Sequence, residues 1–371
     1  MTINWTRGDG QKCAVFMKED GEDLPAPVNK TTYTANSIFG TGDQIASTGW
    51  YCVYNGTGNN LVVTGLTGGK TYKVMVLEYN GIAGVENYNT NTATNNPNSQ
   101  LAANYFYVSP TGDDATGDGS FGSPWRTIQH AVDNASTADV ISVMDDDNVS
   151  TDDYTENVNV DKIVTIQRYD DDDTRPQVKA ASSGDHVFEI QTDSVKIDGL
   201  DIYGATNNKY GIYSGNWDDV TITNNRCGWD DTHYNYYGIG TGGVGTGTIS
   251  SNICNYNSQS VIHIRATYTV DNNTVNYNQK YGIVLNGANS TISNNSINNN
   301  TDDGINVSYS NHNTISSNTL NNNGDRGIIL SLSSKYNTVS NNTLDGNAVT
   351  GIFVGYDFGA SNNYVIENTI S

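Results

Sequence analysis

A repeat of about twenty-two residues runs from Gly211 to the C-terminus, and it constrains the fold more than any other feature. Its seven copies read roughly Gly-Ile-x-x, a short polar turn, then Thr-Ile-Ser-x-Asn-x-Ile; residues 304–320 and 327–344 are the clearest. Strand-like triplets with no helical stretch fill each copy. This pattern is typical of a parallel β-solenoid, in which each repeat forms one coil that stacks on the next.

An asparagine recurs at one place in the second half of every copy. Equivalent positions of successive coils stack about 4.8 Å apart, so these amides can hydrogen-bond to one another and to the turn backbone. We therefore predict an asparagine ladder that belongs to the scaffold and not to a ligand site. Its members are Asn225, Asn252, Asn273, Asn295, Asn318, Asn342 and Asn368.

Three apolar columns accompany the ladder, and alternation along each strand predicts that they point inward. The Gly that opens each copy suits a tight corner with a positive φ. Cys227 and Cys254 are neighbours in one column, where we expect buried thiols, with a stacked disulfide as the alternative. The columns are Ile222, Ile249, Val270, Ile292, Ile315, Val339 and Val365; Cys227, Cys254, Val275, Ile297, Leu320, Leu344 and Ile370; and Ile212, Ile239, Val261, Ile283, Ile305, Ile328 and Ile352.

The chain is strongly acidic, with 18 basic and 40 acidic residues and a net charge of −22. This charge argues against nucleic acid and anionic membrane surfaces as partners, and it fits an extracellular, calcium-containing setting. The runs at 145–147 and 170–173 are predicted as solvated turns. No stretch is long enough for a membrane helix, and no signal-peptide pattern opens the chain, so a secreted protein would be represented by its mature segment.

Residues 1–97 have a different pattern, with short strands separated by Gly, Asn and Asp turns. The stretch 65–74 resembles the E–F corner of fibronectin type III domains. The resemblance implies a β-sandwich with Tyr72 as the corner tyrosine and Trp5 in the core, although Gly68 stands where the family usually has Pro. The first edge strand of such a domain is absent or supplied from elsewhere. A disulfide between Cys13 and Cys52 would fit an oxidising compartment.

After a linker at 98–104, residues 105–371 form the second predicted domain. The segments 105–114 and 123–132 resemble the opening of secreted, pectate-lyase-like right-handed β-helix proteins. Ser123 is a suitable N-cap and Pro124 a suitable first helical residue for a capping helix at about 124–135. The predicted fold is therefore all-β: a fibronectin type III-like sandwich, then a right-handed parallel β-helix of roughly ten coils with an N-terminal capping helix.

Asp113, Asp114 and Asp118 resemble a calcium loop, but the acidic residue that closes an EF-hand loop is missing. We keep calcium as one hypothesis and simple Asx turns as the other. No other cofactor is indicated.

The longest loop between regular copies, at 224–238, is rich in aromatic and acidic residues. Aromatic faces can stack on sugar rings and carboxylates can accept hydrogen bonds from hydroxyls, which makes this loop a candidate glycan contact. The alternative is that the aromatic side chains cover the flank of the solenoid. The candidate residues are Trp217 on the preceding turn and, in the loop, Trp229, Asp230, Asp231, His233, Tyr234, Tyr236 and Tyr237.

His263 and Arg265 are the candidate catalytic pair. Strict alignment of the repeat points Val261 and His263 inward, whereas a slip of one residue buries Ile262 and Ile264 and turns His263 and Arg265 outward. We predict the slipped register because it avoids a buried histidine. Side by side, the two could serve β-elimination, one removing the C5 proton of a uronate and the other neutralising its carboxylate.

Right-handed β-helices of this kind include lyases, hydrolases, epimerases, tailspikes and adhesins, so the fold does not decide the function. The pair Asp302–Asp303 resembles the paired Asp of polygalacturonases, but their Gly-His-Gly and Arg-Ile-Lys motifs are absent, as is the Asp-Pro-His-Glu motif of mannuronan epimerases. The sequence leaves open whether the chain is an enzyme.

The first hypothesis is a secreted or cell-surface module that binds polysaccharide or forms a structural or adhesive part of an extracellular assembly. Because the last coil at 369–371 has no capping segment, we expect a segment of a longer adhesin or a subunit that polymerises end to end with copies of itself. The alternative is a polysaccharide lyase or glycoside hydrolase acting on an acidic polysaccharide.

Overall fold

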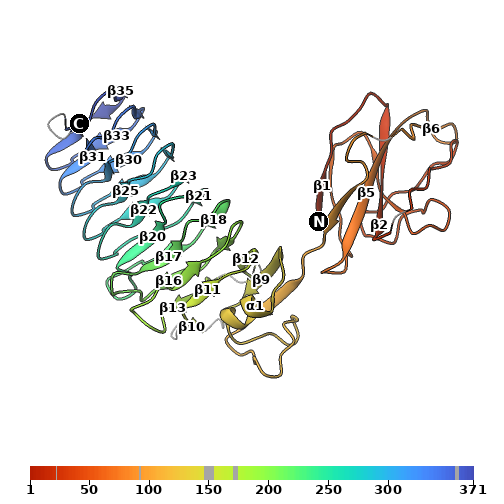
Figure 1. The fold of residues 1–371 in the computed structure, drawn as a ribbon, viewed down its shortest axis with the longest axis horizontal. Coiled ribbons are helices and arrows are strands. Elements are labelled where there is room, and N and C mark those ends of the chain that lie inside the picture. The colour runs from red at the N-terminus through yellow and green to blue at the C-terminus, as the bar shows by residue number, and fades with distance from the viewer. Residues whose placement is uncertain (22, 92, 146–153, 170–173, 356–358) are drawn as a thin grey trace. The chain divides into compact units, whose positions relative to one another are not determined.

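The computed structural model describes residues 1–371 except 22, 92, 146–153, 170–173 and 356–358. It divides into two compact units, Met1–Asn104 and Tyr105–Ser371 (Figure 1). The turn predicted at 170–173, and residues 146 and 147 of the other acidic run, lie outside the described residues. No helix in the described part of the chain has the length and apolar character needed to span a membrane.

The second unit is a right-handed parallel β-helix of about nine turns, which confirms the predicted fold class with slightly fewer coils than expected. One face is a nine-stranded sheet whose strands follow one another in chain order (Figure 1). This sheet consists of β11 (Val158–Val160), β14 (Phe188–Ile190), β17 (Tyr210–Ser214), β20 (Tyr237–Thr241), β22 (Ile262–Ile264), β25 (Ile283–Leu285), β28 (Ile305–Ser308), β31 (Arg326–Ser331) and β34 (Thr350–Val354).

An eleven-stranded parallel sheet forms the second face. It consists of β8 (Tyr105–Val108), β9 (Asp139–Val143), β12 (Val164–Arg168), β15 (Lys196–Asp198), β18 (Val220–Thr223), β21 (Thr246–Ser250), β23 (Thr267–Asp271), β26 (Thr291–Ser293), β29 (Thr314–Ser316), β32 (Thr338–Ser340) and β35 (Tyr364–Ile366).

The third face is made of two shorter sheets, which the isolated bridges of Ile253 to Arg226 and to Thr274 connect. The first contains β10 (Tyr154–Thr155), β13 (Gln177–Lys179), β16 (Asp201–Tyr203) and β19 (Arg226–Cys227), and the second contains β24 (Thr274–Asn276), β27 (Ser296–Asn298), β30 (Thr319–Asn321), β33 (Thr343–Asp345) and β36 (Thr369–Ile370).

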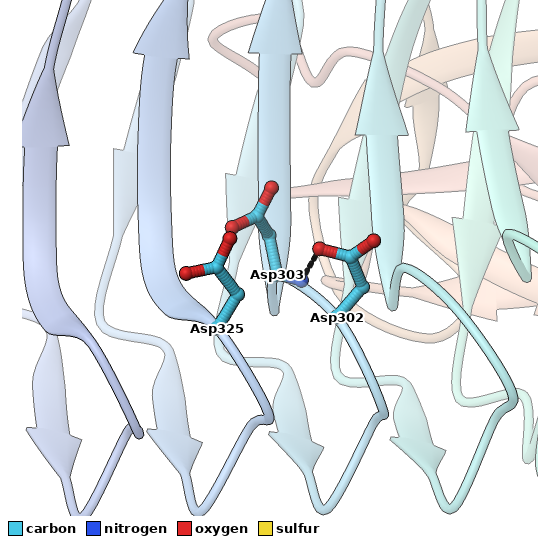
Figure 2. Close-up of side chains that lie close together, drawn as sticks. All are labelled: Asp302, Asp303 and Asp325. Atoms are coloured by element: carbon cyan, nitrogen blue, oxygen red, sulfur yellow. Dashed lines mark hydrogen bonds between the residues drawn. The ribbon is translucent and has the colours of Figure 1, made fainter.

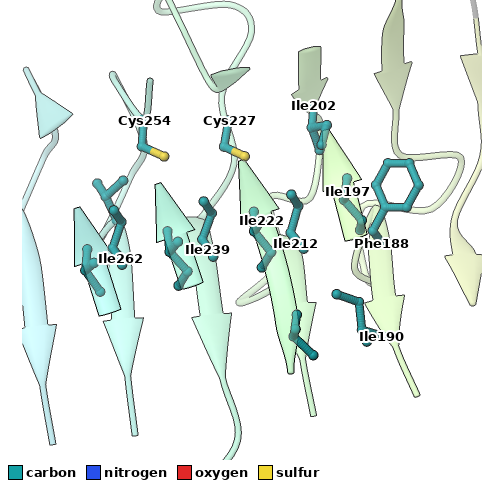
Figure 3. Packing of buried hydrophobic residues seen from close by; sticks show 14 of the residues in the cluster. Phe188, Ile190, Ile197, Ile202, Ile212, Ile222, Cys227, Ile239, Cys254 and Ile262 are labelled. Atoms are coloured by element: carbon teal, nitrogen blue, oxygen red, sulfur yellow. The ribbon is translucent and has the colours of Figure 1, made fainter. Parts of the chain in front are cut away.

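The inward side chains form the three predicted columns, with one correction. Ile262 pairs with Ile239, so Ile262 and not Val261 continues the column that begins at Ile212. Cys227 and Cys254 occupy neighbouring positions of another column and are free, fully buried thiols (Figure 3). Burial raises the pKa of the Cys227 thiol, as expected for a cysteine that serves as a small apolar residue.

The predicted asparagine ladder is confirmed. Asn295 Nδ2 donates to Asn318 Oδ1 and to the Val270 carbonyl, both at 2.9 Å, and Asn295 Oδ1 accepts from the backbone and side-chain nitrogens of Asn273 at 2.9 and 3.0 Å. Two further ladders that we did not predict run along other corners of the coils. Their members are Asn235, Asn257, Asn278, Asn300, Asn323 and Asn347, and Asn313, Asn337 and Asn363.

The Gly that opens each copy has a different role from the one predicted. Gly304 does not have a positive φ, and a Cβ there would lie 2.7 Å from the carbonyl oxygen of Gly327 and 2.8 Å from Leu320 Cδ2. Glycine is therefore needed for the close approach of the next coil. The positive φ falls instead on the residue before each ladder Asn, as at Asn294 (56°) and Ser317 (58°).

The capping helix α1 (Ile128–Asn134) begins later than predicted. Its N-cap is Thr127 and not Ser123, because the Thr127 side chain accepts from His130 N and the segment before it is held extended by a bridge between Val108 and Trp125. Ile128, Ala131 and Val132 of the helix are buried in the solenoid core. The helix also receives a buried cap that the sequence did not reveal: Glu156 accepts from the backbone nitrogens of Ile128 and Gln129 at 2.9 and 3.0 Å.

The first unit contains a five-stranded antiparallel sheet and a two-stranded sheet. The former consists of β3 (Tyr51–Gly56), β2 (Lys12–Glu19), β5 (Thr71–Asn80), β6 (Asn87–Tyr88) and β7 (Asn98–Leu101), and the latter of β1 (Thr2–Asn4) and β4 (Asn60–Val62). Strand β7 lies within the segment predicted as a linker, and it pairs with β5. The first unit therefore extends through that segment to residue 104.

Two apolar clusters cover the two faces of the five-stranded sheet. The Tyr72 hydroxyl accepts from Thr67 N at 2.9 Å, the contact that we expected of a corner tyrosine. Cys52 packs with Ala14 on one face, whereas Cys13 points to the other because side chains alternate along β2. A Cys13–Cys52 disulfide is therefore wrong, and both thiols are free. The fibronectin type III resemblance remains a prediction.

Candidate functional site

The outer face of the nine-stranded sheet carries the predicted catalytic pair. Gly240 pairs with His263, and Ile262 and Ile264 are buried on either side of it, so the slipped register is confirmed. His263 points outward and is half-buried, and Arg265 is exposed two residues further along. The outward row through His263 contains Glu189, Tyr213, Gly240, His263, Val284 and Asn306.

Aromatic rings line this face on the N-terminal side of His263. The rings of Tyr210 and Tyr237 stack with centroids 4.6 Å apart, and those of His186 and Tyr213 stack at 4.7 Å. The Tyr210 ring also lies over Gly240, where an added Cβ would collide with it. The missing side chain at Gly240 therefore lets Tyr210 reach across one strand to His263.

The hydrogen bonds around His263 fix its tautomer. Asn286 Nδ2 donates to the carbonyl and the hydroxyl of Ser308, both at 3.0 Å, so Asn286 Oδ1 faces His263 Nε2 at 2.8 Å. The Nε2 atom must then carry the hydrogen. His263 Nδ1 keeps its lone pair, which faces the Tyr210 hydroxyl at 3.3 Å and Arg265 Nη2 at 3.4 Å.

The charges of the site follow from burial. Burial, together with the positive charge of Arg265, lowers the pKa of His263 to about 4. Burial raises the pKa of Tyr210 to about 12. At neutral pH the imidazole and the phenol are both uncharged, and Arg265 supplies the positive charge. Within the described ranges, no carboxylate lies within ion-pair distance of the Arg265 guanidinium.

This arrangement offers three kinds of interaction. The part-exposed rings of Tyr213 and Tyr237 present aromatic faces, Arg265 presents an exposed cation, and the unprotonated Nδ1 of His263 is a proton acceptor at neutral pH. The backbone of Arg265 is itself held, since its nitrogen donates to Thr241 Oγ1 at 2.9 Å.

The seven candidate residues of the long loop and Trp217 on the preceding turn do not form one site. Tyr236 and Tyr237 lie at the His263 face, where their rings meet edge to face at 4.8 Å. Trp229 and His233 lie with the third face, stacked at 4.7 Å, and the Arg226 guanidinium sits 4.4 Å from the Trp229 ring centroid.

Among the described residues, the remaining candidates have structural partners, except for Asp231. Asp230 accepts from the backbone nitrogens of Thr232 and His233, both at 2.8 Å, and Tyr234 offers its carbonyl to a neighbouring turn. Trp217 packs against the core, and Asp231 is exposed. Around Trp229, these contacts support the alternative that the aromatic side chains cover the flank.

The three carboxylates of the calcium hypothesis are each bound by local donors. Asp113 accepts from Ala115 N at 2.8 Å, Asp118 accepts from Ser120 N at 3.0 Å, and Asp114 accepts from the backbone nitrogens of Arg126 and Thr127 before α1. They do not form a group with oxygens close enough to share an ion. The Asx-turn alternative explains this segment, and the calcium hypothesis is not supported.

One other group of acidic residues does converge. Among the described residues, carboxylate oxygens of Asp302, Asp303 and Asp325 lie within 4.8 Å of one another (Figure 2). Arg326 Nη1 already pairs with Asp325 at 2.6 Å and with Asp303 at 3.3 Å, so the protein's own cation neutralises part of this charge. Sequence reasoning noticed the first two residues but missed Asp325, which the stacking of the next coil brings beside them.

Comparisons with known proteins agree with the fold. The family model described as a right-handed beta helix region matches residues 261–371. A search of curated proteins found no match.

Solved structures with similar folds include two phage tailspikes. Full-length tailspike protein 2 from Escherichia coli O157:H7 bacteriophage CAB120 is 14% identical with a TM-score of 0.50, over 82% of this chain and 49% of that one. The Dettilon tailspike protein gp208 is 17% identical with a TM-score of 0.50, over 72% and 62%. The periplasmic alginate epimerase AlgG is 12% identical with a TM-score of 0.43, over 63% and 61%. The likeness shows the fold alone, and the chain spans about half the length of the first tailspike.

Proposed function

We propose that this chain is a secreted or cell-surface module that binds polysaccharide along the outer face of its nine-stranded sheet. The observation that supports this most is the pair of part-exposed rings beside an exposed cation: Tyr213 stacks on His186, Tyr237 stacks on the buried Tyr210, and Arg265 lies next to them. Sugar rings present flat C–H faces that pack on aromatic side chains, while their hydroxyls take hydrogen bonds from polar neighbours.

The face suits a long ligand better than a small one. Its outward residues lie on successive coils about 4.8 Å apart, so contacts repeat along the axis of the solenoid. The three ladders and the buried columns hold these coils in fixed register, which presents the rings without a conformational cost at binding. An extended glycan that follows the axis could therefore contact several coils at once.

Binding to a panel of immobilised polysaccharides tests this function. Replacing Tyr213 and Tyr237 together by Ala should weaken binding about 10-fold, because each aromatic contact contributes about 0.5–1.5 kcal/mol. Tyr364→Ala is the matched control, since this tyrosine is 64% exposed on the eleven-stranded sheet. Failure of every glycan to bind, or equal losses in the double variant and the control, would overturn the proposal.

The second candidate is a lyase or hydrolase acting on an acidic polysaccharide, and the geometry of His263 supports the lyase reaction. A neutral imidazole with its Nδ1 lone pair beside the Tyr210 hydroxyl and the Arg265 guanidinium has the groups that proton abstraction next to a uronate carboxylate needs. Incubation with pectin, alginate and glycosaminoglycans, followed for unsaturated products and new reducing ends, tests it. Activity must disappear in His263→Ala, and a complete lack of products would leave binding as the function.

A further inference from the structure

We infer that the glycan bound at this face is acidic and places a sugar carboxylate on the Arg265 guanidinium. This inference rests on the proposed function and names the class of its ligand. The stacked rings alone would accept neutral and acidic sugars equally well, because every pyranose ring offers an apolar face. The choice therefore depends on the charge beside the rings.

Arg265 differs from Arg226 and Arg326 of the same unit, which form ion pairs. Arg226 pairs with Asp201, and Arg326 pairs with both Asp303 and Asp325. Arg265 is exposed, and in the part of the chain that the structure describes no carboxylate lies within ion-pair distance of it. Among the described residues, Arg265 therefore places a positive charge without a carboxylate partner beside the aromatic rings, on a chain of net charge −22.

The residues around Arg265 orient its side chain and add no negative charge. Its backbone is fixed by Thr241, and its Nη2 lies 3.4 Å from His263 Nδ1. His263, Tyr210, Tyr237 and Asn286 are all uncharged at neutral pH. The guanidinium keeps free N–H groups in the planar geometry that binds a carboxylate through two parallel hydrogen bonds.

The overall acidity of the chain does not prevent this contact. In the outward row, the acidic residue on the N-terminal side is Glu189, three strands from His263, or roughly 14 Å at the spacing of a sheet. On the C-terminal side, Asn306 lies two strands from His263 and donates to Asp303, whose charge is already paired with Arg326. The Debye length at physiological salt is about 8 Å, so the charge of Glu189 is largely screened while the contact at Arg265 is not. Binding should therefore be measured near 0.15 M salt, where a charge roughly 14 Å away is already largely screened.

Pectins that differ only in methyl esterification provide the test, because esterification removes the carboxylate charge and leaves the sugar backbone unchanged. The intact protein should bind de-esterified polygalacturonate at least 10-fold more tightly than the highly esterified form. Arg265→Gln should remove this preference and Arg265→Lys should keep only part of it. The matched control is Lys335→Gln, which removes the same charge from the loop after β31. Alginate and its ester provide a second pair with a different backbone.

The outcomes separate the two proposals. Equal binding of esterified and free forms would overturn the inference while the proposed function stands. Preference for a sulfated glycan over the carboxylated ones would also overturn it, since the geometry assigned here is that of a planar carboxylate. Failure to bind any member of either pair or of the wider panel would overturn the proposed function itself. Loss of preference in Lys335→Gln as well would assign the effect to net charge and not to Arg265.

Discussion

His263 is uncharged in the folded protein because its ring is half-buried beside a cation, and this makes its contribution to stability depend on pH. Tyr210, Tyr237, Arg265 and Asn286 surround it, and none of them carries a negative charge. An unfolded chain protonates such a histidine near pH 6.5, whereas the folded protein does so only near pH 4. Between these values the unfolded state binds more protons, so the free energy of unfolding rises with pH.

We therefore predict that the stabilisation is complete above about pH 6.5 and is lost as the pH falls towards 4, with a total of about 1–3 kcal/mol. In urea denaturation, the stability difference between the wild type and His263→Gln should shrink by that amount from pH 7 to pH 4. The same experiment with His186→Gln serves as a comparison, since burial also lowers the pKa of His186 to about 4. A difference that stays constant with pH would contradict the assignment.

The ladder asparagines should be far more costly to replace than asparagines at the surface. Asn295→Ala leaves Asn273 N and the Val270 carbonyl without their partners inside the protein. Each buried unsatisfied group costs about 1–3 kcal/mol, so we expect a loss of roughly 3–5 kcal/mol in chemical denaturation. The control Asn207→Ala removes an exposed contact with Ser183 and should change stability by less than about 0.5 kcal/mol. Equal losses would mean that the ladder amides contribute no more than surface amides.

The first ladder could be predicted from the sequence and the others could not, for a simple reason. In each copy the ladder Asn follows the central strand triplet, such as TIS at 291–293, at a constant distance, so the column of Asn295 is unambiguous. Asn300 stands in the run Asn298–Asn300, where any of three amides could have been the buried one. Only the position of the coil corner selects Asn300, which is 1% exposed.

At the scale of elements, the site depends on the side chains that three neighbouring strands, β17, β20 and β22, place next to one another. Tyr210 of β17 reaches His263 of β22 because Gly240 of β20 has no side chain. Gly240→Ala should displace the Tyr210 ring, expose His263 to water and raise the pKa of the imidazole from about 4 towards its usual range. An NMR titration of the imidazole measures this.

The control for this prediction is Gly243, which lies just after strand β20. An added Cβ at Gly243 meets no atom within 4 Å, so Gly243→Ala should leave the pKa of His263 unchanged. Neither glycine has a positive φ, so alanine fits the backbone in both variants. An unchanged pKa of His263 in Gly240→Ala would show that Tyr210 does not need the space over residue 240.

Element boundaries show where local sequence rules were overridden. Ser123 and Pro124 are good signals for a helix start, yet α1 begins at Ile128 because Asp114 and Glu156 satisfy the backbone nitrogens just before and at its first turn. Those partners are 12 and 28 residues away from the nitrogens that they bind, and no local pattern reveals them. The eight predicted glycan-contact residues fall on two faces for a similar reason. Asn235 is buried at a coil corner, so Trp229 and Tyr237 fall on different faces of the helix.

For the whole molecule, the two compact units should unfold separately, because each has its own buried clusters. In a solenoid each coil contacts mainly its neighbours, so damage to one coil should spread to adjacent coils first. Ile315 is fully buried between Ile292 and Val339 in β29, and a carboxylate there would have neither water nor a cation.

Ile315→Asp should therefore abolish amide protection in the coils next to β29 while leaving β2 and β5 of the first unit protected, as measured by hydrogen exchange with mass spectrometry. Thr314→Asp is the matched control, because Thr314 is exposed and the same charge there stays in water. Loss of protection in β2 and β5 along with β29 would show that the chain unfolds as one cooperative unit. A loss of protection confined to residues near 315 would show instead that the asparagine ladders hold the adjacent coils even when one apolar column is broken. The stability of the stack would then depend less on its apolar core than the burial of that core indicates.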